Sequence, residues 1–312
     1  MSAASLPIID IGPLVAGTGG AAEAEVARQI DEACREHGFF YVVGHGVPDE
    51  LQARLDRHAR EFFALPEAQK AEIAMTRGGR AWRGWFPVGG ELTSGRPDRK
   101  EGIYFGAELG PDHPKVVEGV VLHGANLFPE QPAELGPTVL EYLEALTDVG
   151  HALVRGVSLA LGHGADGFRD TLTSDPLTLF RIFHYPPDPA PDEWGVGEHT
   201  DYGLLTLLLQ DDHGGLQVRS GDAWIDAPPV AGSFVCNLGD MLERLTGGRY
   251  RSTAHRVLNT SGAERLSFPF FFDPGWDAVI DDAGTTYGEY VSSKVARVFP
   301  DLHSEVGGDA QT

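Results

Sequence analysis

The spacing of hydrophobic residues predicts helices in the first half of the chain. Apolar positions recur at the helical period in three segments, residues 21–37, 48–63 and 137–161. Gly38 is expected to end the first of these helices. The β-rich runs at residues 6–11 and 39–43 predict short strands. Residues 76–95 are rich in glycine, arginine and tryptophan and have no clear period, which predicts an ordered loop.

The pattern changes in the second half of the chain, where short β-rich runs follow one another between turn residues. Six such runs are found, at residues 177–185, 204–210, 215–218, 233–237, 252–257 and 266–272. Short strands at even spacing are typical of an all-β sandwich or barrel.

Three residues in this half are candidate metal ligands. His199 and Asp201 are separated by one residue, so an extended backbone at Thr200 would place both side chains on one face. His255 lies in another β-like run. Two histidines and one carboxylate leave positions open on an iron ion for a co-substrate and O₂. We therefore expect His199, Asp201 and His255 to bind a metal.

Arg265 and Ser267 form a second alternating pair, ten positions after His255. An arginine fork matches a carboxylate with two hydrogen bonds, and a serine hydroxyl can add a third. A buried arginine is costly unless an anion neutralises it. The pair predicts a carboxylate-binding site next to the metal.

Together these motifs resemble the Fe(II)- and 2-oxoglutarate-dependent dioxygenases of the isopenicillin N synthase-like group. The similarity extends over nearly the whole chain, through residues 7–10, 38–47, 199–203, 214–218, 237–240 and 252–257. The resemblance implies a mainly β fold with flanking helices, built on a double-stranded β-helix (jelly roll) core.

The resemblance also implies Fe(II), 2-oxoglutarate and O₂ as cofactor and co-substrates, with ascorbate as reductant. It implies oxidation of a small organic molecule, most often hydroxylation, with release of succinate and CO₂. Tyr185 matches a family tyrosine near the co-substrate carboxylate, beside Arg265 and Ser267. Phe183 stands where many plant members have asparagine, which argues against a plant-hormone or flavonoid substrate.

Substrate contacts are expected in the loop over residues 77–104, at Trp82 and Arg83 in particular. Its glycines would let the loop fold tightly or move as a lid. The alternative is that Trp82 packs in the core and that the loop's basic residues pair on the surface with nearby acids, namely Glu91, Asp98 and Glu101.

Phenylalanines on the core strands complete the expected substrate site, namely Phe183, Phe271 and Phe272. Strand alternation places Phe271 on the face of Arg265 and makes it the better candidate for a cavity wall. This aromatic content favours a largely apolar substrate, and the arginines suit one with a carboxylate or phosphate.

Other functions fit parts of the pattern. An oxidase of isopenicillin N synthase type could use Arg265 and Ser267 for a substrate carboxylate, and residues 199–205 and 210–212 are also similar to the microbial ethylene-forming enzyme. A zinc hydrolase would use the same ligands but would leave Arg265 and Ser267 without a purpose. A non-catalytic binding protein is a further alternative, since fold does not fix function.

The amino-acid composition limits the kinds of molecule that the protein is expected to bind. Lys and Arg total 24 and Asp and Glu total 46 in 312 residues, so the formal net charge is −22. Such acidity disfavours binding to nucleic acids and anionic membranes. The sequence shows no signal-peptide pattern and no run long enough to span a bilayer. We expect a cytoplasmic monomer or weak homo-oligomer that acts on a small molecule.

The same patterns predict one integrated catalytic domain. Residues 1–105 are expected to form an N-terminal helix and strand region with the lid loop, and residues 106–176 a helical support. Residues 177–300 would form the β-helix core and residues 301–312 a tail.

Overall fold

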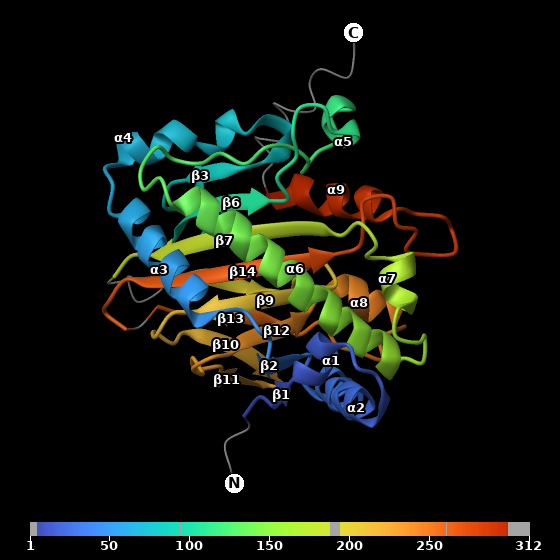
Figure 1. The fold of residues 1–312 in the computed structure, drawn as a ribbon. Helices are drawn as coiled ribbons and strands as arrows, with labels where there is room; N and C mark the ends of the chain where they lie inside the picture. Colours follow the sequence, from blue (N-terminus) through green and yellow to red (C-terminus); the bar gives the residue numbers. More distant parts are fainter. Residues whose placement is uncertain (1–4, 94, 188–193, 260, 299–312) are drawn as a thin grey trace.

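The fold is described from a computed structural model, which covers residues 5–93, 95–187, 194–259 and 261–298. The expected tail at residues 301–312 lies outside these described residues. Two sheets dominate this part of the chain (Figure 1). The larger has the order β1-β2-β12-β9-β14-β7-β6-β3 and the smaller the order β11-β10-β13-β8. This arrangement agrees with the mainly β core expected from the sequence.

Strands of the larger sheet come from both halves of the chain. They are β1 (Ile8–Asp10), β2 (Phe39–Val43), β3 (Gly84–Phe86), β6 (Glu101–Gly106), β7 (Leu177–Tyr185), β9 (Leu205–Gln210), β12 (Phe234–Leu238) and β14 (Arg265–Asp273). The smaller sheet comprises β8 (Val196–His199), β10 (Leu216–Ser220), β11 (Ala223–Asp226) and β13 (His255–Val257). A short pair, β4 (Leu92–Thr93) and β5 (Arg96–Pro97), forms a separate two-stranded sheet, and β4 contacts β8.

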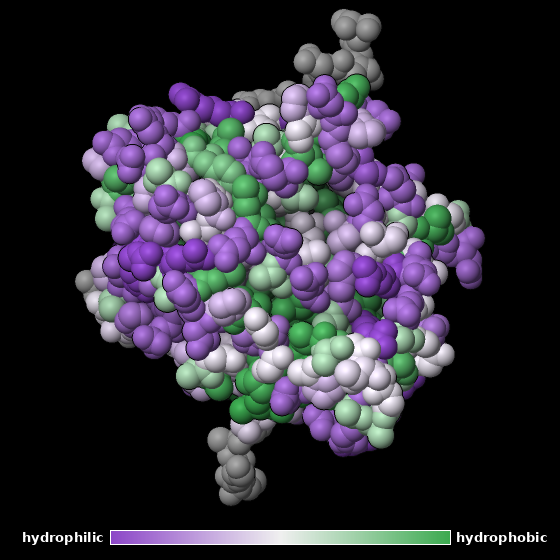
Figure 2. All heavy atoms as spheres, in the orientation of Figure 1, coloured by the Kyte–Doolittle hydropathy of each residue, from purple (hydrophilic) through white to green (hydrophobic). Residues whose placement is uncertain are grey.

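Helices cover one face of the larger sheet, with α3 and α6 lying across it (Figure 1). The helices are α1 (Gly12–Ala16), α2 (Gly20–Glu36), α3 (Asp49–Phe63), α4 (Glu67–Lys70), α5 (Pro114–Val117), α6 (Leu135–Ala160), α7 (Gly167–Thr171), α8 (Asp240–Leu245) and α9 (Tyr287–Val298). Hydrophilic side chains dominate this face, and hydrophobic ones show between them (Figure 2). None of the described helices combines the length and apolarity needed to cross a bilayer.

Strand β14 is buried on both faces and separates two environments. Leu266, Phe268, Phe270 and Phe272 belong to the core that the helices cover. A Cβ atom added at Gly150 of α6 would overlap the Phe272 ring, so helix and strand touch closely. The alternate residues face the other way, into a cavity between the sheets: Arg265, Ser267, Pro269, Phe271 and Asp273.

Two sequence predictions of local structure need correction. The expected strand over residues 252–257 begins only at His255, in β13. The expected loop over residues 76–95 contains β3 and β4, together with tight 3₁₀ turns before Trp82. Strands of two or three residues show no measurable alternation, and β3 exists because it pairs with β6.

Gly38, between α2 and β2, fixes the position of the segment before His255. Its φ is +67°, and a Cβ atom added there would overlap the Arg251 carbonyl oxygen. We predict that Gly38→Ala lowers the free energy of unfolding by about 1–2 kcal/mol for the left-handed backbone, and further because the Arg251 segment must shift. Urea denaturation measures the loss.

The matched control for this variant is Gly247→Ala. Gly247 has a φ of +61° and nothing within 4 Å of its added Cβ. Gly247→Ala therefore has only the cost of the left-handed backbone and no steric overlap. An equal loss of unfolding free energy in the two variants would contradict the contact between Gly38 and Arg251.

Asp273 joins the end of β14 to α9 and to the loop before β9. Its carboxylate accepts hydrogen bonds from the Tyr287 hydroxyl at 2.8 Å and the Leu204 N–H at 2.9 Å. Burial raises the pKa of Asp273 from 3.8 to about 7, although both hydrogen bonds work to lower it. Between these two pH values the folded protein holds a proton that the unfolded chain has lost.

We therefore predict that the contribution of Asp273 to the stability of the metal-free protein falls as pH rises from about 4 to 7. Asp273→Asn cannot titrate, so the free energy of unfolding of the wild type should fall relative to that of the variant over the same window. Urea unfolding at several pH values gives the two profiles. Parallel profiles for the wild type and the variant would show that Asp273 does not titrate in this way.

Candidate functional site

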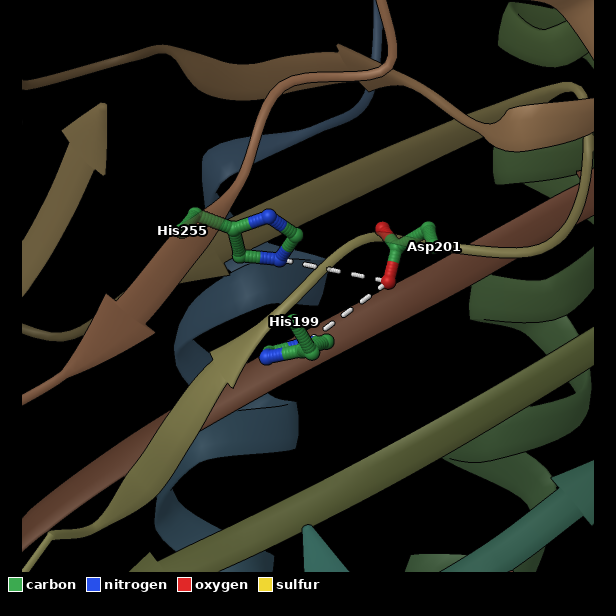
Figure 3. Close-up of side chains that lie close together, drawn as sticks. All are labelled: His199, Asp201 and His255. Carbon is green, nitrogen blue, oxygen red and sulfur yellow. Dashed lines mark ion pairs between the residues drawn. The ribbon is translucent and has the colours of Figure 1, made fainter. Parts of the chain in front are cut away.

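The three predicted metal ligands converge at the edge of the smaller sheet (Figure 3). His199 ends β8 and His255 begins β13, and the two residues are partners across this strand pair. Their Nε2 atoms lie 3.8 and 3.9 Å from Asp201 Oδ1. One ligand atom from each residue lies within 4.8 Å of the others, a spacing that could hold a metal ion.

Asp201 reaches this point in a different way from the one expected. β8 ends at His199, so Asp201 lies in the connection to β9 and not on a strand face. Thr206 Oγ1 and Asn237 Nδ2 both donate hydrogen bonds to Asp201 Oδ2, at 2.5 and 2.7 Å. These bonds orient the carboxylate and leave Oδ1 directed at the histidines.

Backbone carbonyls orient both imidazole rings. His199 Nδ1 lies 2.8 Å from the Gly197 carbonyl oxygen, and His255 Nδ1 lies 3.2 Å from that of Thr253. When Nδ1 donates these bonds, Nε2 carries the free lone pair that a metal requires.

The pKa shifts of His255 and Asp201 also favour metal binding, because they leave His255 neutral and Asp201 ionised at pH 7. Burial, with the nearby His199, lowers the pKa of His255 to about 4, so this ring is neutral at pH 7. Burial works to raise the pKa of Asp201, but the two histidines and its hydrogen bonds outweigh burial and lower it. The neutral His255 imidazole, the ionised Asp201 carboxylate and the adjacent His199 imidazole form a donor set that suits Fe(II) or another divalent cation.

The expected carboxylate site opens into the same cavity, whose volume is about 500 Å³. Arg265 is fully buried, and its guanidinium stacks on the Tyr185 ring at 4.8 Å. Its Nε donates to the Gly214 carbonyl at 3.1 Å, whereas Nη1 and Nη2 have no hydrogen-bond partner among the described residues. The Ser267 and Tyr185 hydroxyls lie 3.2 Å apart beside it.

A buried guanidinium with two unpaired nitrogens is costly unless a ligand satisfies it. A carboxylate matches the two free nitrogens, and the adjacent hydroxyls can donate further bonds. The residues present therefore fit the carboxylate of a co-substrate such as 2-oxoglutarate.

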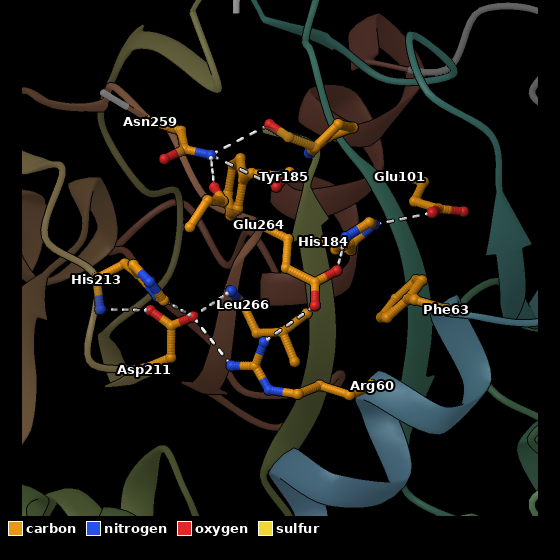
Figure 4. A network of polar contacts seen from close by, with 12 residues as sticks. Arg60, Phe63, Glu101, His184, Tyr185, Asp211, His213, Asn259, Glu264 and Leu266 are labelled. Carbon is orange, nitrogen blue, oxygen red and sulfur yellow. Dashed lines mark hydrogen bonds and ion pairs between the residues drawn. The ribbon is translucent and has the colours of Figure 1, made fainter. Parts of the chain in front are cut away.

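A polar network around Leu266, the residue after Arg265, holds the start of β14 in place (Figure 4). Asp211 Oδ2 accepts the Leu266 N–H at 2.7 Å and pairs with Arg60 of α3 at 3.2 Å. His184 lies between Glu101 and Glu264, at 2.9 and 3.2 Å. The sequence analysis missed this support, because Arg60 and Asp211 are 151 positions apart and no local pattern links them.

The expected substrate residues fall into two groups. Phe183 and Phe271 line the cavity, and alternation indicated this for Phe271. Phe272 faces the helices, where its ring lies 5.0 Å from that of His151. Trp82 and Arg83 are buried within the N-terminal region and are not among the described residues that line this cavity.

Contrary to expectation, Trp82 and Arg83 therefore do not contact this cavity. Arg83 donates to the Leu122 carbonyl at 2.8 Å, and a Cβ atom added at Gly106 would overlap the same guanidinium nitrogen. The Arg83 side chain is enclosed, and this burial lowers its pKa to about 10.

Another part of the same loop does reach the cavity. Glu91, Leu92, Thr93, Gly95 and Lys100 line it. The expected surface pairs are buried instead, because Lys100 Nζ lies 2.8 Å from Glu91 and 2.5 Å from Asp98. Arg181 of β7 also lines the cavity and was missed, although it alternates with Phe183 and Tyr185 along one strand.

Comparisons with known proteins agree with this geometry. Residues 6–131 match the family model described as non-haem dioxygenase in morphine synthesis N-terminal, and residues 176–274 match that of the 2OG-Fe(II) oxygenase superfamily. A probable iron/ascorbate oxidoreductase of Dictyostelium discoideum is 44% identical, over 96% of each chain. A homoarginine-6-hydroxylase of Arabidopsis thaliana is 39% identical, over 95% of this chain and 98% of the relative.

Solved structures show the same architecture. A full-length Neurospora crassa protein, crystallised in complex with alpha-KG, superposes with a TM-score of 0.80 at 25% identity, over 94% of this chain and 96% of that one. The assignment favours an oxygenase over the zinc hydrolase and the binding protein considered above. The chain belongs to the 2OG-Fe(II) oxygenase superfamily, and it is a 2-oxoglutarate-dependent oxidoreductase that uses Fe(II), 2-oxoglutarate and O₂.

Proposed function

We propose that this enzyme hydroxylates a small organic molecule, with release of succinate and CO₂. One observation carries the proposal: a buried arginine with two unpaired nitrogens shares a cavity with three converging metal-ligand atoms. Relatives named homoarginine-6-hydroxylase, 36–39% identical over most of the chain, support hydroxylation as the reaction.

The proposed roles follow from the contacts around each side chain. His199, Asp201 and His255 hold Fe(II), and Arg265, Ser267 and Tyr185 bind the distal carboxylate of 2-oxoglutarate. Bound Fe(II) and 2-oxoglutarate supply the oxidising chemistry with O₂. Thr206 and Asn237 hold Asp201 Oδ1 toward the metal, and the Gly197 and Thr253 carbonyls fix the imidazole tautomers. Phe183 and Phe271 keep water from the substrate side of the cavity.

A second candidate reaction is oxidation without hydroxylation, such as desaturation, ring closure or ethylene formation. Relatives named 1-aminocyclopropane-1-carboxylate oxidase, 36% identical over 97% of this chain, support it. Mass spectrometry of the product separates the two reactions, because hydroxylation adds one oxygen atom to the substrate.

We also propose ascorbate as the reductant, since a relative is named a probable iron/ascorbate oxidoreductase. We propose that the enzyme acts in the cytoplasm, as a monomer or weak homo-oligomer. The net charge of −22 supports a free small-molecule substrate over one bound to nucleic acid.

His199→Ala should abolish turnover and weaken Fe(II) binding while the fold is kept, because one of three ligands is lost. Anaerobic Fe(II) titration and circular dichroism measure binding and fold. The matched control is His163→Ala, since His163 is exposed and stacks on Phe168 away from the cavity. Fe(II) binding at wild-type strength by His199→Ala would remove His199 from the ligand set.

Arg265→Ala should weaken 2-oxoglutarate binding by about a hundredfold or more, because a charge-assisted bidentate contact is lost. Arg265→Lys should recover only part of this affinity, since an ammonium lacks the planar fork. Anaerobic titration of the Fe(II) protein gives the dissociation constants, and Arg219→Lys on β10, a residue that does not line the cavity, is the control. An unchanged constant in Arg265→Lys would refute the bidentate contact.

A further inference from the structure

A second guanidinium faces the cavity from strand β7. Leu179, Arg181, Phe183 and Tyr185 alternate along β7 and all line the cavity. The proposed function uses Arg265 for 2-oxoglutarate and leaves Arg181 without a role. We propose that Arg181 binds a carboxylate of the primary substrate, which is then a small organic acid; this assignment rests on the proposed function.

Arg181 and Arg265 form separate sites within the cavity. Ser267 pairs with Phe183 across the two strands, which puts Arg181 beside Pro269. Pro269 lies four residues from Arg265, or about 13 Å along β14. The two guanidinium groups also stack on different rings. Arg265 stacks on Tyr185, whereas Arg181 lies over Tyr104 and Phe271.

Two aromatic rings clamp Arg181 in a fixed orientation. The guanidinium carbon lies 4.2 Å from the centre of the Tyr104 ring and 4.7 Å from that of Phe271. Cation–π contacts of this kind hold the plane of the group while its N–H edge stays available. A planar fork held in advance loses little conformational entropy when it binds a carboxylate.

The hydrogen-bonding capacity of Arg181 is only partly used by the described residues. Its Nε is buried without a hydrogen-bond partner among the described residues. Its Nη1 lies 3.4 Å from Glu91 Oε1, well beyond the roughly 2.7–2.9 Å of a strong charge-assisted bond. A quarter of the side chain remains accessible, and the residue lines the cavity.

Glu91 already has stronger partners than Arg181. Lys100 Nζ lies 2.8 Å from Glu91, and the Tyr104 hydroxyl donates to Glu91 Oε1. Burial works to raise the pKa of Glu91, but Lys100, Arg181 and these bonds lower it to about 2. Glu91 is therefore ionised and held in place, and it contacts Nη1 of Arg181 without occupying Nε.

The charges around Arg181 suit the carboxylate of either a simple organic acid or a zwitterionic amino acid. Glu91, Asp98, Lys100 and Arg181 sum to zero formal charge, so no net anionic charge in this cluster opposes a carboxylate. A simple acid would use Arg181 alone. A zwitterionic amino acid would place its carboxylate on Arg181 and its ammonium near Glu91. In both cases the apolar body would lie along Phe183 and Phe271, toward the metal ligands.

The test is succinate release by the Fe(II) enzyme with 2-oxoglutarate over matched sets of small molecules. Each set contains an amino acid, the acid that lacks the amine, and the amine that lacks the carboxylate. Members with a carboxylate should stimulate release and the amines should not. If only the amino acids stimulate release, the substrate is a zwitterion. If the amino acids and the acids without an amine both stimulate release, the carboxylate alone is sufficient. Equal stimulation by amines, or none by any acid, would overturn the proposal.

Two variants then test Arg181 itself. With the best acid from the panel, Arg181→Gln should raise KM by about tenfold or more, and Arg181→Lys by less, while the dissociation constant of 2-oxoglutarate stays near the wild-type value. Lysine keeps a charge beside Glu91, so this variant serves if the glutamine variant does not fold. The control is Arg219→Gln, since Arg219 also stacks on a ring, that of Trp224, but lies outside the cavity.

Wild-type KM in either folded variant would overturn the role of Arg181. The proposed function fails in a distinguishable way, namely if the wild-type Fe(II) protein neither binds nor consumes 2-oxoglutarate.

Discussion

The burial of strand β14 on both faces is the constraint on which the rest of the structure depends. One face carries four apolar side chains that pack under the helices, and removal of a single buried phenylalanine typically costs about 3–5 kcal/mol. The other face carries Arg265, Ser267 and Phe271 into the cavity. A shift of one residue in register would exchange these faces and place an arginine in the apolar core. Packing in the core therefore fixes the functional side chains in place.

Burial of cations beside the cavity requires compensation from the surrounding protein. Each buried ion carries an effective penalty of several kcal/mol. Lys100 and Arg181 are offset by Glu91 and Asp98, whereas Arg265 has no acidic partner among the described residues. Asp211 supports Arg265 from behind by holding the neighbouring Leu266 N–H. Arg265 therefore lies, without an acidic partner among the described residues, where a dianionic co-substrate would bind. Its burial costs stability in the free protein, and the same unpaired charge provides the binding site.

The sequence was most informative where side-chain alternation and motif coincide. Arg265, Ser267 and Phe271 could be placed on one face because they alternate along the nine residues of β14, whereas His199 and His255 were identified by their motifs on the shorter strands β8 and β13. Arg181 follows the same alternation, but no motif drew attention to it. The Asp211–Arg60 support and the Glu91–Lys100 pair could not be predicted, since long-range contacts leave no local pattern. Trp82 and Arg83 were expected to contact the substrate but do not line the cavity, because amino-acid composition does not distinguish a buried loop from a lid.

The central claim is that the cavity separates two carboxylates, with that of 2-oxoglutarate on Arg265 and that of the substrate on Arg181. An anaerobic crystal structure with Fe(II) and 2-oxoglutarate tests it most directly. The account predicts a metal bound by His199, Asp201 and His255, the distal carboxylate of 2-oxoglutarate on Arg265, and Arg181 free of it. A distal carboxylate on Arg181, or a metal held by residues outside this triad, would contradict the account.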